Sequence, residues 1–342
     1  MVEFKKWRII VQLIVGAAIL LWLLHFADAG NVLGAILQIN PLDLVAAAFF
    51  FIIASTFVGL ALYTPIRKSS PKASLRKVIT ASFAGQLISD VTPVRSGYFI
   101  TPIFLNELAN VPVEQGMVGV LTTAGVNSLV KVLLCIIGLG YFASFLQLPV
   151  EVVNTLIVGI TTLFIGGVFL LLLMWEKRIV WLFKKLNKLP LIGKSSLKLV
   201  EAIKSIQENG KNSKHSVVFV AFLIFFSVLG NAAALYILFN GFNGIWCSSL
   251  SIIDFLLIAS ISSTLTYVPI TIAGLGVQEV GYVILLSLLL KIPISPNSIN
   301  SSLVAFALIV RALFTGTDII GIVPLLKIGF KNIKLQNSAN CI

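Results

Sequence analysis

The chain has 342 residues, of which 58% are hydrophobic and only 11% are charged, whereas soluble domains carry about 25% charged residues. This composition excludes a soluble globular protein and predicts an integral membrane protein. The 25 Lys and Arg residues outnumber the 13 Asp and Glu residues, which gives a net charge of +12. Because excess cation in a membrane protein gathers in cytoplasmic loops beside anionic lipids, we do not interpret this charge as nucleic-acid binding.

Six apolar runs reach the length of roughly 20 residues that a membrane-spanning helix needs. They are residues 9–27, 42–66, 117–144, 152–174, 217–240 and 299–324. The first follows a basic head and no small-residue cleavage site comes after it, so we expect an uncleaved anchor rather than a signal peptide.

The distribution of basic residues predicts the orientation of these spans. Lys and Arg cluster before the first span, after the second and throughout residues 175–216, whereas the loops 28–41, 145–151 and 241–251 contain none. The positive-inside rule therefore predicts that both termini lie in the cytoplasm. We expect a multi-pass protein of the plasma membrane.

Two further apolar stretches, residues 78–110 and 252–290, must each leave and return on the same side if the charge rule holds. Each is interrupted by Pro and Gly, in VTPVRSGYFITP and YVPITIAGLGVQE. Irregular backbone at membrane depth is tolerated only where protein or a watery cavity surrounds it. We therefore predict two re-entrant hairpins, the first entering from the cytoplasm and the second from outside. The residues that break them are Pro93, Gly97, Pro269, Gly274 and Gly276.

The two broken stretches are faintly similar to each other. ASFAGQLISDVTP precedes a span with a cation, NSLVKVLLCIIGLG, and ASISSTLTYVP precedes IVRALFTGTDIIG. Because the hairpins open on opposite faces, the pattern predicts an inverted repeat, which in many transporters places a binding site at mid-membrane. The predicted fold is all-α, with about six full spans and two re-entrant hairpins.

The chain is predicted to form a single transmembrane domain over residues 1–342. Its approximate halves, 1–174 and 217–342, are joined by a basic loop over 175–216. Apolar residues in this loop share helical faces that are flanked by lysines, which predicts amphipathic helices lying on the inner leaflet.

Charged residues inside the apolar stretches are the main candidates for function, because each costs about 2.5–3.5 kcal/mol at the centre of a helix. Three are cations that could hold an anionic group such as a lipid phosphate. They are Arg95, Lys131 and Arg311. Three are carboxylates that could balance charge or relay a proton, namely Asp90, Glu279 and Asp318. The alternative is that Lys131 and Arg311 merely neutralise these carboxylates and fix helix packing.

Other kinds of chemistry find no support in the sequence. Cys135, Cys247 and Cys341 are scattered without the spacing of a disulfide framework or a metal site. The glycine-rich AGLGVQEVG lacks the preceding strand of a dinucleotide site. No soluble segment exceeds about 40 residues, which is too short for a catalytic domain. We expect no metal and no cofactor, and any catalysis would have to occur within the membrane.

The segment VPITIAGLGVQEVGY, together with TPVRSGYF and IVRALFTGTDIIG, resembles a flippase-like membrane family that includes the transmembrane region of lysylphosphatidylglycerol synthases. The resemblance spans nearly the whole chain. It implies one motif at Pro93, Arg95 and Gly97. It implies a second motif, which is carried by Pro269, Gly274, Gly276 and Glu279.

The sequence departs from that family at Tyr98, where an acidic residue is usual. The soluble synthase domain of the family is also not found here, so synthesis of an aminoacyl lipid is not expected. The resemblance implies movement of a charged or glycosylated lipid between leaflets.

The sequence therefore predicts a flippase-like transporter of an anionic or glycosylated lipid. It favours a protein that is not an enzyme over one that is. One alternative is an intramembrane transferase that uses a polyprenyl-phosphate sugar, with Asp90 or Glu279 as the base. Another is a scaffold that does not transport and that serves cell-envelope enzymes. Membrane lipids are the expected partners. Association with a cell-envelope or lipid-modifying enzyme, or with further copies of the chain, stays open.

Overall fold

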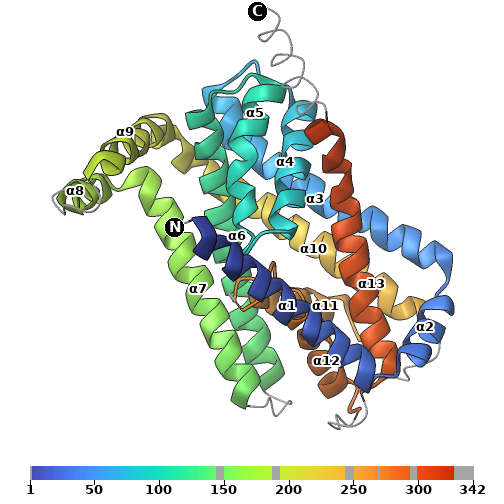
Figure 1. The fold of residues 1–342 in the computed structure, drawn as a ribbon. Coiled ribbons are helices and arrows are strands. Elements are labelled where there is room, and N and C mark those ends of the chain that lie inside the picture. Colours follow the sequence, from blue (N-terminus) through green and yellow to red (C-terminus); the bar gives the residue numbers. More distant parts are fainter. Residues whose placement is uncertain are drawn as a thin grey trace, which may run out of the picture.

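The computed structural model describes residues 2–143, 150–186, 193–242, 250–268, 270–292 and 299–326. Within these ranges the regular structure is helical, as Figure 1 shows, and the one strand-like pairing is an isolated antiparallel bridge between Pro93 and Ile272. The predicted all-α class is confirmed.

Five helices are long and apolar enough to cross a membrane. They are α3 (Pro41–Ser69), α6 (Val113–Ala143), α7 (Val150–Trp175), α10 (Val217–Gly241) and α13 (Ser301–Asp318), which η3 (Ile319–Gly321) prolongs. A sixth span is obtained if α1 (Val2–Phe26) and α2 (Ala29–Leu37), bent by 85° at their junction, count as one. Five of the six predicted spans overlap these five helices, and the first overlaps α1, which passes the test only together with α2. The protein is a multi-pass membrane protein.

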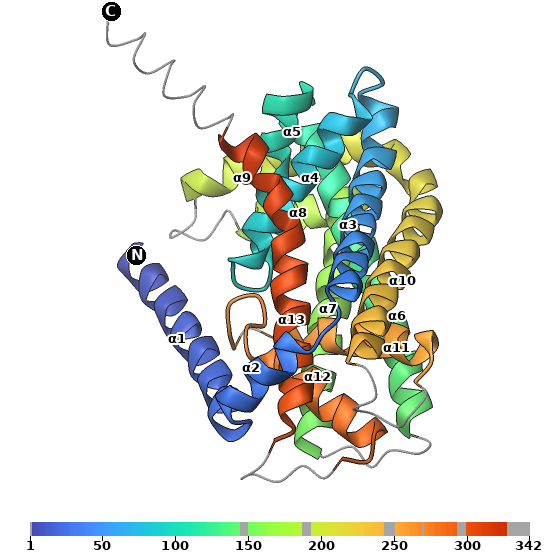
Figure 2. The same cartoon turned by 90° about the vertical axis from the view of Figure 1, so that its right-hand side faces the viewer.

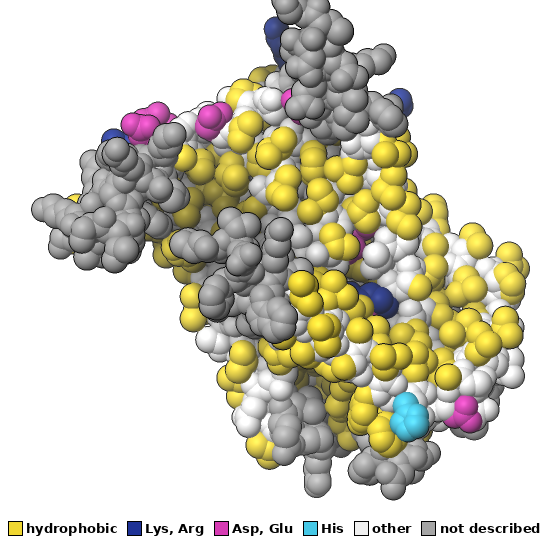
Figure 3. All heavy atoms as spheres, viewed as in Figure 1, with side chains coloured by type: hydrophobic (Ala, Val, Ile, Leu, Met, Phe, Trp, Pro, Cys, Tyr) yellow, Lys and Arg dark blue, Asp and Glu magenta, His cyan; other side chains and the backbone are white. Residues whose placement is uncertain are grey.

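The outer faces of these helices are apolar. Phe164 on α7 and Val218 on α10 are more than half exposed. Figure 3 shows hydrophobic side chains over most of the visible face, with a basic side chain in a hollow near its centre. A surface of this kind suits lipid rather than water.

Polar residues at the helix starts fix where the buried helices begin. Asn40 accepts a hydrogen bond from the Leu42 backbone N–H at 3.0 Å, and Asn300 caps α13 in the same way. Ser251 and Asp254 form a capping box at the start of α11 (Ile252–Leu265). Asp254 therefore has the capping role that its position favours.

Residues 28–41, predicted as a loop, contain the helix α2. Asp28 caps it by accepting a hydrogen bond from the Gly30 N–H at 3.0 Å. Val32 and Ala35 on one face are buried against the bundle. The segment forms a short helix because it has an N-terminal cap and an apolar face. Its lack of basic residues bears on the orientation of the chain and does not prevent a helix.

The basic segment between the halves forms α8 (Lys177–Leu186) and α9 (Gly193–Gly210). Val200 and Ile203 of α9 are buried, and they pack with Val180 of α8 and Leu173 of α7. Val200 and Ile203 are therefore covered by protein, and the position of the segment on the inner leaflet stays a prediction.

The two predicted halves are interleaved in space. Helix α3 of the first half packs along α10 of the second, and α6 packs against α11. The core is therefore shared between the halves.

Both apolar stretches predicted as hairpins form a helix, a break and a second helix. The first consists of α4 (Leu75–Asp90), η1 (Ser96–Ile100) and α5 (Thr101–Ala109); the second consists of α11 and α12 (Val277–Leu289). Figures 1 and 2 show α4 and α5 in the half of the bundle near α9, and α11 and α12 in the opposite half. The bridge from Pro93 to Ile272 joins the two breaks between them. Pro269 lies outside the described residues.

The first break depends on the absence of a side chain at Gly97. A Cβ there would lie 2.6 Å from the Ile88 carbonyl oxygen of α4. That contact is with backbone, which cannot move aside as the end of a flexible side chain can. Gly97 therefore allows η1 to fold back onto the end of α4.

Replacing Gly97 with Ala should destabilise the protein by about 1–3 kcal/mol, as expected for overpacking a close contact. Thermal unfolding in detergent would measure this as a lower midpoint. Gly140→Ala is the matched control, because a Cβ at that position in α6 has no atom within 4 Å. Equal midpoints for the two variants would contradict the tight packing at Gly97.

Candidate functional site

The first break turns through two residues in the left-handed region. Val94 has φ 54° and Arg95 has φ 55°, a conformation that L-residues other than Asn and Asp seldom adopt. Side chains hold the turn: the Gly97 N–H donates to Thr92 Oγ1 at 2.7 Å, and Ser89 Oγ donates to the Arg95 carbonyl at 2.9 Å.

The Arg95 side chain forms an ion pair with Asp90 at the end of α4. Its Nε also donates to Ser89 Oγ at 3.3 Å. The guanidinium lies 5.2 Å from the centre of the Phe314 ring on α13. Arg95 therefore links the first break to the preceding helix α4 and to α13 in the second half of the chain.

The second break is built from small residues at positive φ. Ala273, Gly274 and Gly276 have φ values of 46°, 73° and 82°. A Cβ on Gly276 would lie 2.7 Å from Cβ of Ile19, so this glycine also lets α1 approach the break. These glycines therefore serve the turn, through their positive φ, and the packing, through the lack of a side chain.

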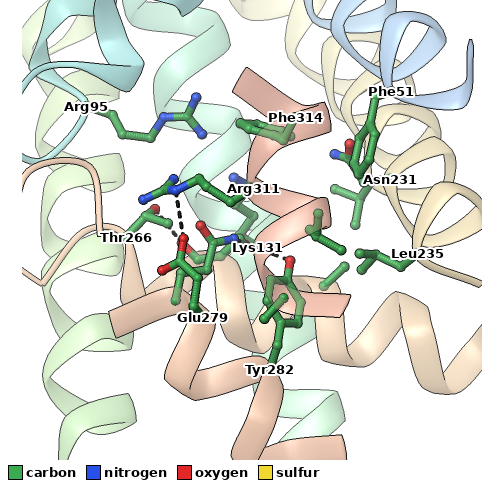
Figure 4. A pocket seen from close by; sticks show the side chains of 16 residues that line it. Phe51, Arg95, Lys131, Asn231, Leu235, Thr266, Glu279, Tyr282, Arg311 and Phe314 are labelled. Atoms are coloured by element: carbon green, nitrogen blue, oxygen red, sulfur yellow. Dashed lines mark hydrogen bonds and ion pairs between the residues drawn. The ribbon is translucent and has the colours of Figure 1, made fainter. Parts of the chain in front are cut away.

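Arg311 anchors the second break from α13. Its Nε lies 2.8 Å from Glu279 Oε1, and its Nη2 donates to the Ala273 carbonyl at 3.2 Å. Glu279 stands in the first turn of α12 and its side chain is 2% exposed. Figure 4 shows Arg311 between Arg95 and Glu279. This ion pair is the contact that the alternative for Arg311, neutralisation of a carboxylate, requires.

Lys131 differs from the two arginines. It extends from the middle of α6, with its Nζ 5.6 Å from the centre of the Tyr267 ring in the second break. Among the described residues it makes no ion pair with a carboxylate. Of the three candidate cations, Lys131 is thus the one whose charge no acidic residue in this part of the chain neutralises.

Asp318 faces the end of α4 rather than Arg311. Its Oδ1 accepts a hydrogen bond from Ser55 Oγ of α3 at 3.1 Å. Its carboxyl group also lies within hydrogen-bonding reach of Asp90. The spacing of seven residues in α13 puts Arg311 and Asp318 on one face, but each of them interacts with a different half of the site.

A cavity of about 300 Å³ connects these elements. Arg95 and Lys131 are the charged residues among the described residues that line it. Its uncharged polar lining comes from five helices and both breaks, and includes Ser55, Gln86, Ser89, Tyr98, Thr123, Asn127, Ser128, Thr162, Ser227, Asn231 and Tyr267. A smaller cavity of about 60 Å³ adjoins it, shares Arg95 and Lys131, and reaches Glu279 and Arg311 (Figure 4).

The sequence reasoning missed the amides in this lining. Asn127 on α6 and Asn231 on α10 both face the cavity, and Oδ1 of Asn231 is buried without a hydrogen-bond donor. A signal was present, because an amide inside a predicted span is also costly and seldom faces lipid. A search limited to charged residues does not find these uncharged amides.

The six charged candidates occupy one connected region. Arg95, Lys131, Arg311 and Glu279 line the two cavities, and Asp90 lies directly behind Arg95. Asp318 joins them through Asp90. Chemically, the larger cavity can receive an anion, since cations and hydrogen-bonding groups line it and the described carboxylates lie behind or outside it. No group of three or more His, Cys, Asp or Glu side chains in the described ranges is placed to hold a metal ion.

Comparison with known proteins adds one match. No curated protein matches the chain. The family described as the lysylphosphatidylglycerol synthase TM region matches residues 9–319, which include all six charged candidates and both breaks. Because the match covers far more than half of the sequence, the chain belongs to the family of the lysylphosphatidylglycerol synthase transmembrane region.

Proposed function

We propose that the protein is a flippase-like transporter that moves an anionic phospholipid between the leaflets. The observation that carries this proposal is the cavity of about 300 Å³ whose charged lining, among the described residues, is cationic. Lys131 is the principal phosphate contact, because no described carboxylate neutralises it. Arg95 and then Arg311 are secondary contacts, since each would have to leave or share its carboxylate.

The size of the cavity supports a headgroup site rather than a site for a whole lipid. A volume of about 300 Å³ is at the lower end of the range of roughly 300–1,000 Å³ for small-ligand pockets. Phe99 of η1 and Phe169 of α7 stand at its edge, and they are 37% and 46% exposed. The acyl chains would pass between these aromatic residues and remain in the bilayer, while the phosphate reaches Lys131.

The arrangement of the broken segments supports a topology with two re-entrant hairpins. Helices α4 and α5 share one half of the bundle, α11 and α12 share the other, and their breaks meet in the middle. We propose that the first hairpin enters from the cytoplasm and the second from outside, as an inverted repeat. Both termini then lie in the cytoplasm, and the plasma membrane is the proposed location.

Lys131→Met should slow the exchange of phosphatidylglycerol between leaflets by about 10- to 100-fold, which corresponds to losing one hydrogen bond to a charged group. Lys131→Arg should retain most of the exchange because it keeps the charge. The assay uses proteoliposomes with a fluorescent phosphatidylglycerol that is quenched from outside. Lys72→Met, at an exposed loop lysine, is the matched control.

The same samples separate the other candidate functions. Recovered lipids of unchanged mass, with exchange that depends on Lys131, would support transport. A lipid of new mass would overturn the transport proposal in favour of an intramembrane transferase. If the samples show no exchange and no lipid of new mass, the result would favour a scaffold for a cell-envelope or lipid-modifying enzyme.

Cysteine labelling tests the topology. In a chain without native cysteines, Lys72→Cys before α4 and Glu114→Cys after α5 should react with a membrane-impermeant maleimide from the same, cytoplasmic side. Ile253→Cys in the first turn of α11 and Lys291→Cys after α12 should react from the opposite side. All four residues are exposed. Reaction of the first two positions from different sides would show that α4 and α5 cross the membrane and would remove the inverted repeat.

A further inference from the structure

A pair of buried carboxyl groups lies at the junction of the two halves. Asp90 ends α4 and Asp318 ends α13, and their side chains are within hydrogen-bonding reach of each other. One oxygen of each has a donor: Arg95 binds Asp90 Oδ1, and Ser55 Oγ donates to Asp318 Oδ1. The other oxygens, Asp90 Oδ2 and Asp318 Oδ2, are both buried and have no donor.

Two adjacent carboxylates cannot both stay charged in such a place. Two negative charges in contact away from water repel strongly, and each acceptor without a donor loses the hydrogen bond that it had in water. A single proton shared by the pair removes both problems, because a protonated carboxyl donates to its neighbour. One negative charge then remains, and Arg95 neutralises it.

We infer that Asp90 and Asp318 form a proton-binding site that holds one shared proton at neutral pH and takes up a second when Arg95 turns to a bound phosphate. This inference rests on the proposed function for its second step. When Arg95 leaves Asp90, the pair keeps one uncompensated negative charge in the interior. A proton from water that binds this carboxylate restores neutrality, so each anion would bind together with one proton and be released with it.

The surroundings favour this pair over Glu279 as the proton carrier. Arg95 from the first break and Arg311 from α13 are the cations that act on Asp90, and Arg95 is the cation that acts on Asp318. Ser55 from α3 contributes an uncharged hydroxyl, and Tyr267 and Lys131 lie beyond Arg95. Glu279, by contrast, is a single carboxylate that forms an ion pair with Arg311 at 2.8 Å, so its charge is compensated although neither of its oxygens has a hydrogen-bond donor among the described residues.

Infrared spectroscopy of the purified protein in nanodiscs tests the shared proton without any transport assay. At pH 7 the wild type should show the C=O stretch of a protonated carboxyl group, which shifts in D₂O. Asp318→Asn should lose this band, because the Asn amide donates to Asp90 and leaves it ionised. Glu279→Gln and the exposed Glu114→Gln should keep it. A wild type without the band, or a band that persists in Asp318→Asn, would overturn the inference.

The coupling is tested by the binding of dihexanoyl phosphatidylglycerol, a phosphodiester that does not titrate near neutral pH. Uptake of one proton per anion makes wild-type binding tighter by about tenfold for each unit that the pH falls between 8 and 6. The double variant Asp90→Asn, Asp318→Asn mimics the fully protonated pair, so its affinity should not depend on pH. The same pH slope in both proteins, or no slope in the wild type, would contradict the coupling.

The infrared and binding experiments test the shared proton and the lipid site independently, so either can be overturned without the other. A protonated-carboxyl band without binding of the phosphatidylglycerol probe at any pH would overturn the proposed lipid site and support the shared proton. Binding and Lys131-dependent exchange without the band would support transport and overturn the proton site.

Discussion

The central constraint on this protein is that irregular backbone and charge inside a membrane must find all of their partners within the protein. The two breaks meet at the Pro93–Ile272 bridge, and an arginine anchors each of them. Arg95 binds Asp90 at the end of the helix that leads into the first break. Arg311 binds both Glu279 and the Ala273 carbonyl of the second break. The packing of α4, α12 and α13 follows from these contacts.

This arrangement distinguishes the arginines, which form ion pairs with carboxylates, from Lys131, which has no described acidic partner. Arg311 contacts both the Glu279 carboxylate and the Ala273 carbonyl, and it is held in place because leaving would remove its charge from two buried acceptors. Lys131 comes from a continuous helix that needs no such anchor. A ligand phosphate could therefore approach it without first breaking an internal ion pair, which is why the proposed anion site centres on Lys131, with Arg95 and Arg311 as secondary contacts.

The two halves of the chain contribute different parts of this centre. The first half supplies Arg95, Asp90 and Lys131, and the second supplies Arg311, Glu279 and Asp318. Asp90 and Asp318 meet across the boundary, so protonation of either carboxyl group changes the electrostatic environment of the other half. A proton shared between the halves gives a physical link between ion binding and any rearrangement of the two broken segments.

The sequence by itself determined the all-α class, the positions of six apolar segments, both breaks and the identity of the buried charges. These follow from local properties: run length, Pro and Gly placement, and the cost of a charge in lipid. Only the tertiary structure decided that Arg95 pairs with Asp90, Arg311 with Glu279 and Asp318 with Ser55, leaving Lys131 without a described acidic partner. It also decided that α9 packs on protein and that Asn127 and Asn231 join the cavity. Such pairings depend on which helices become neighbours, and no local pattern in the chain specifies that.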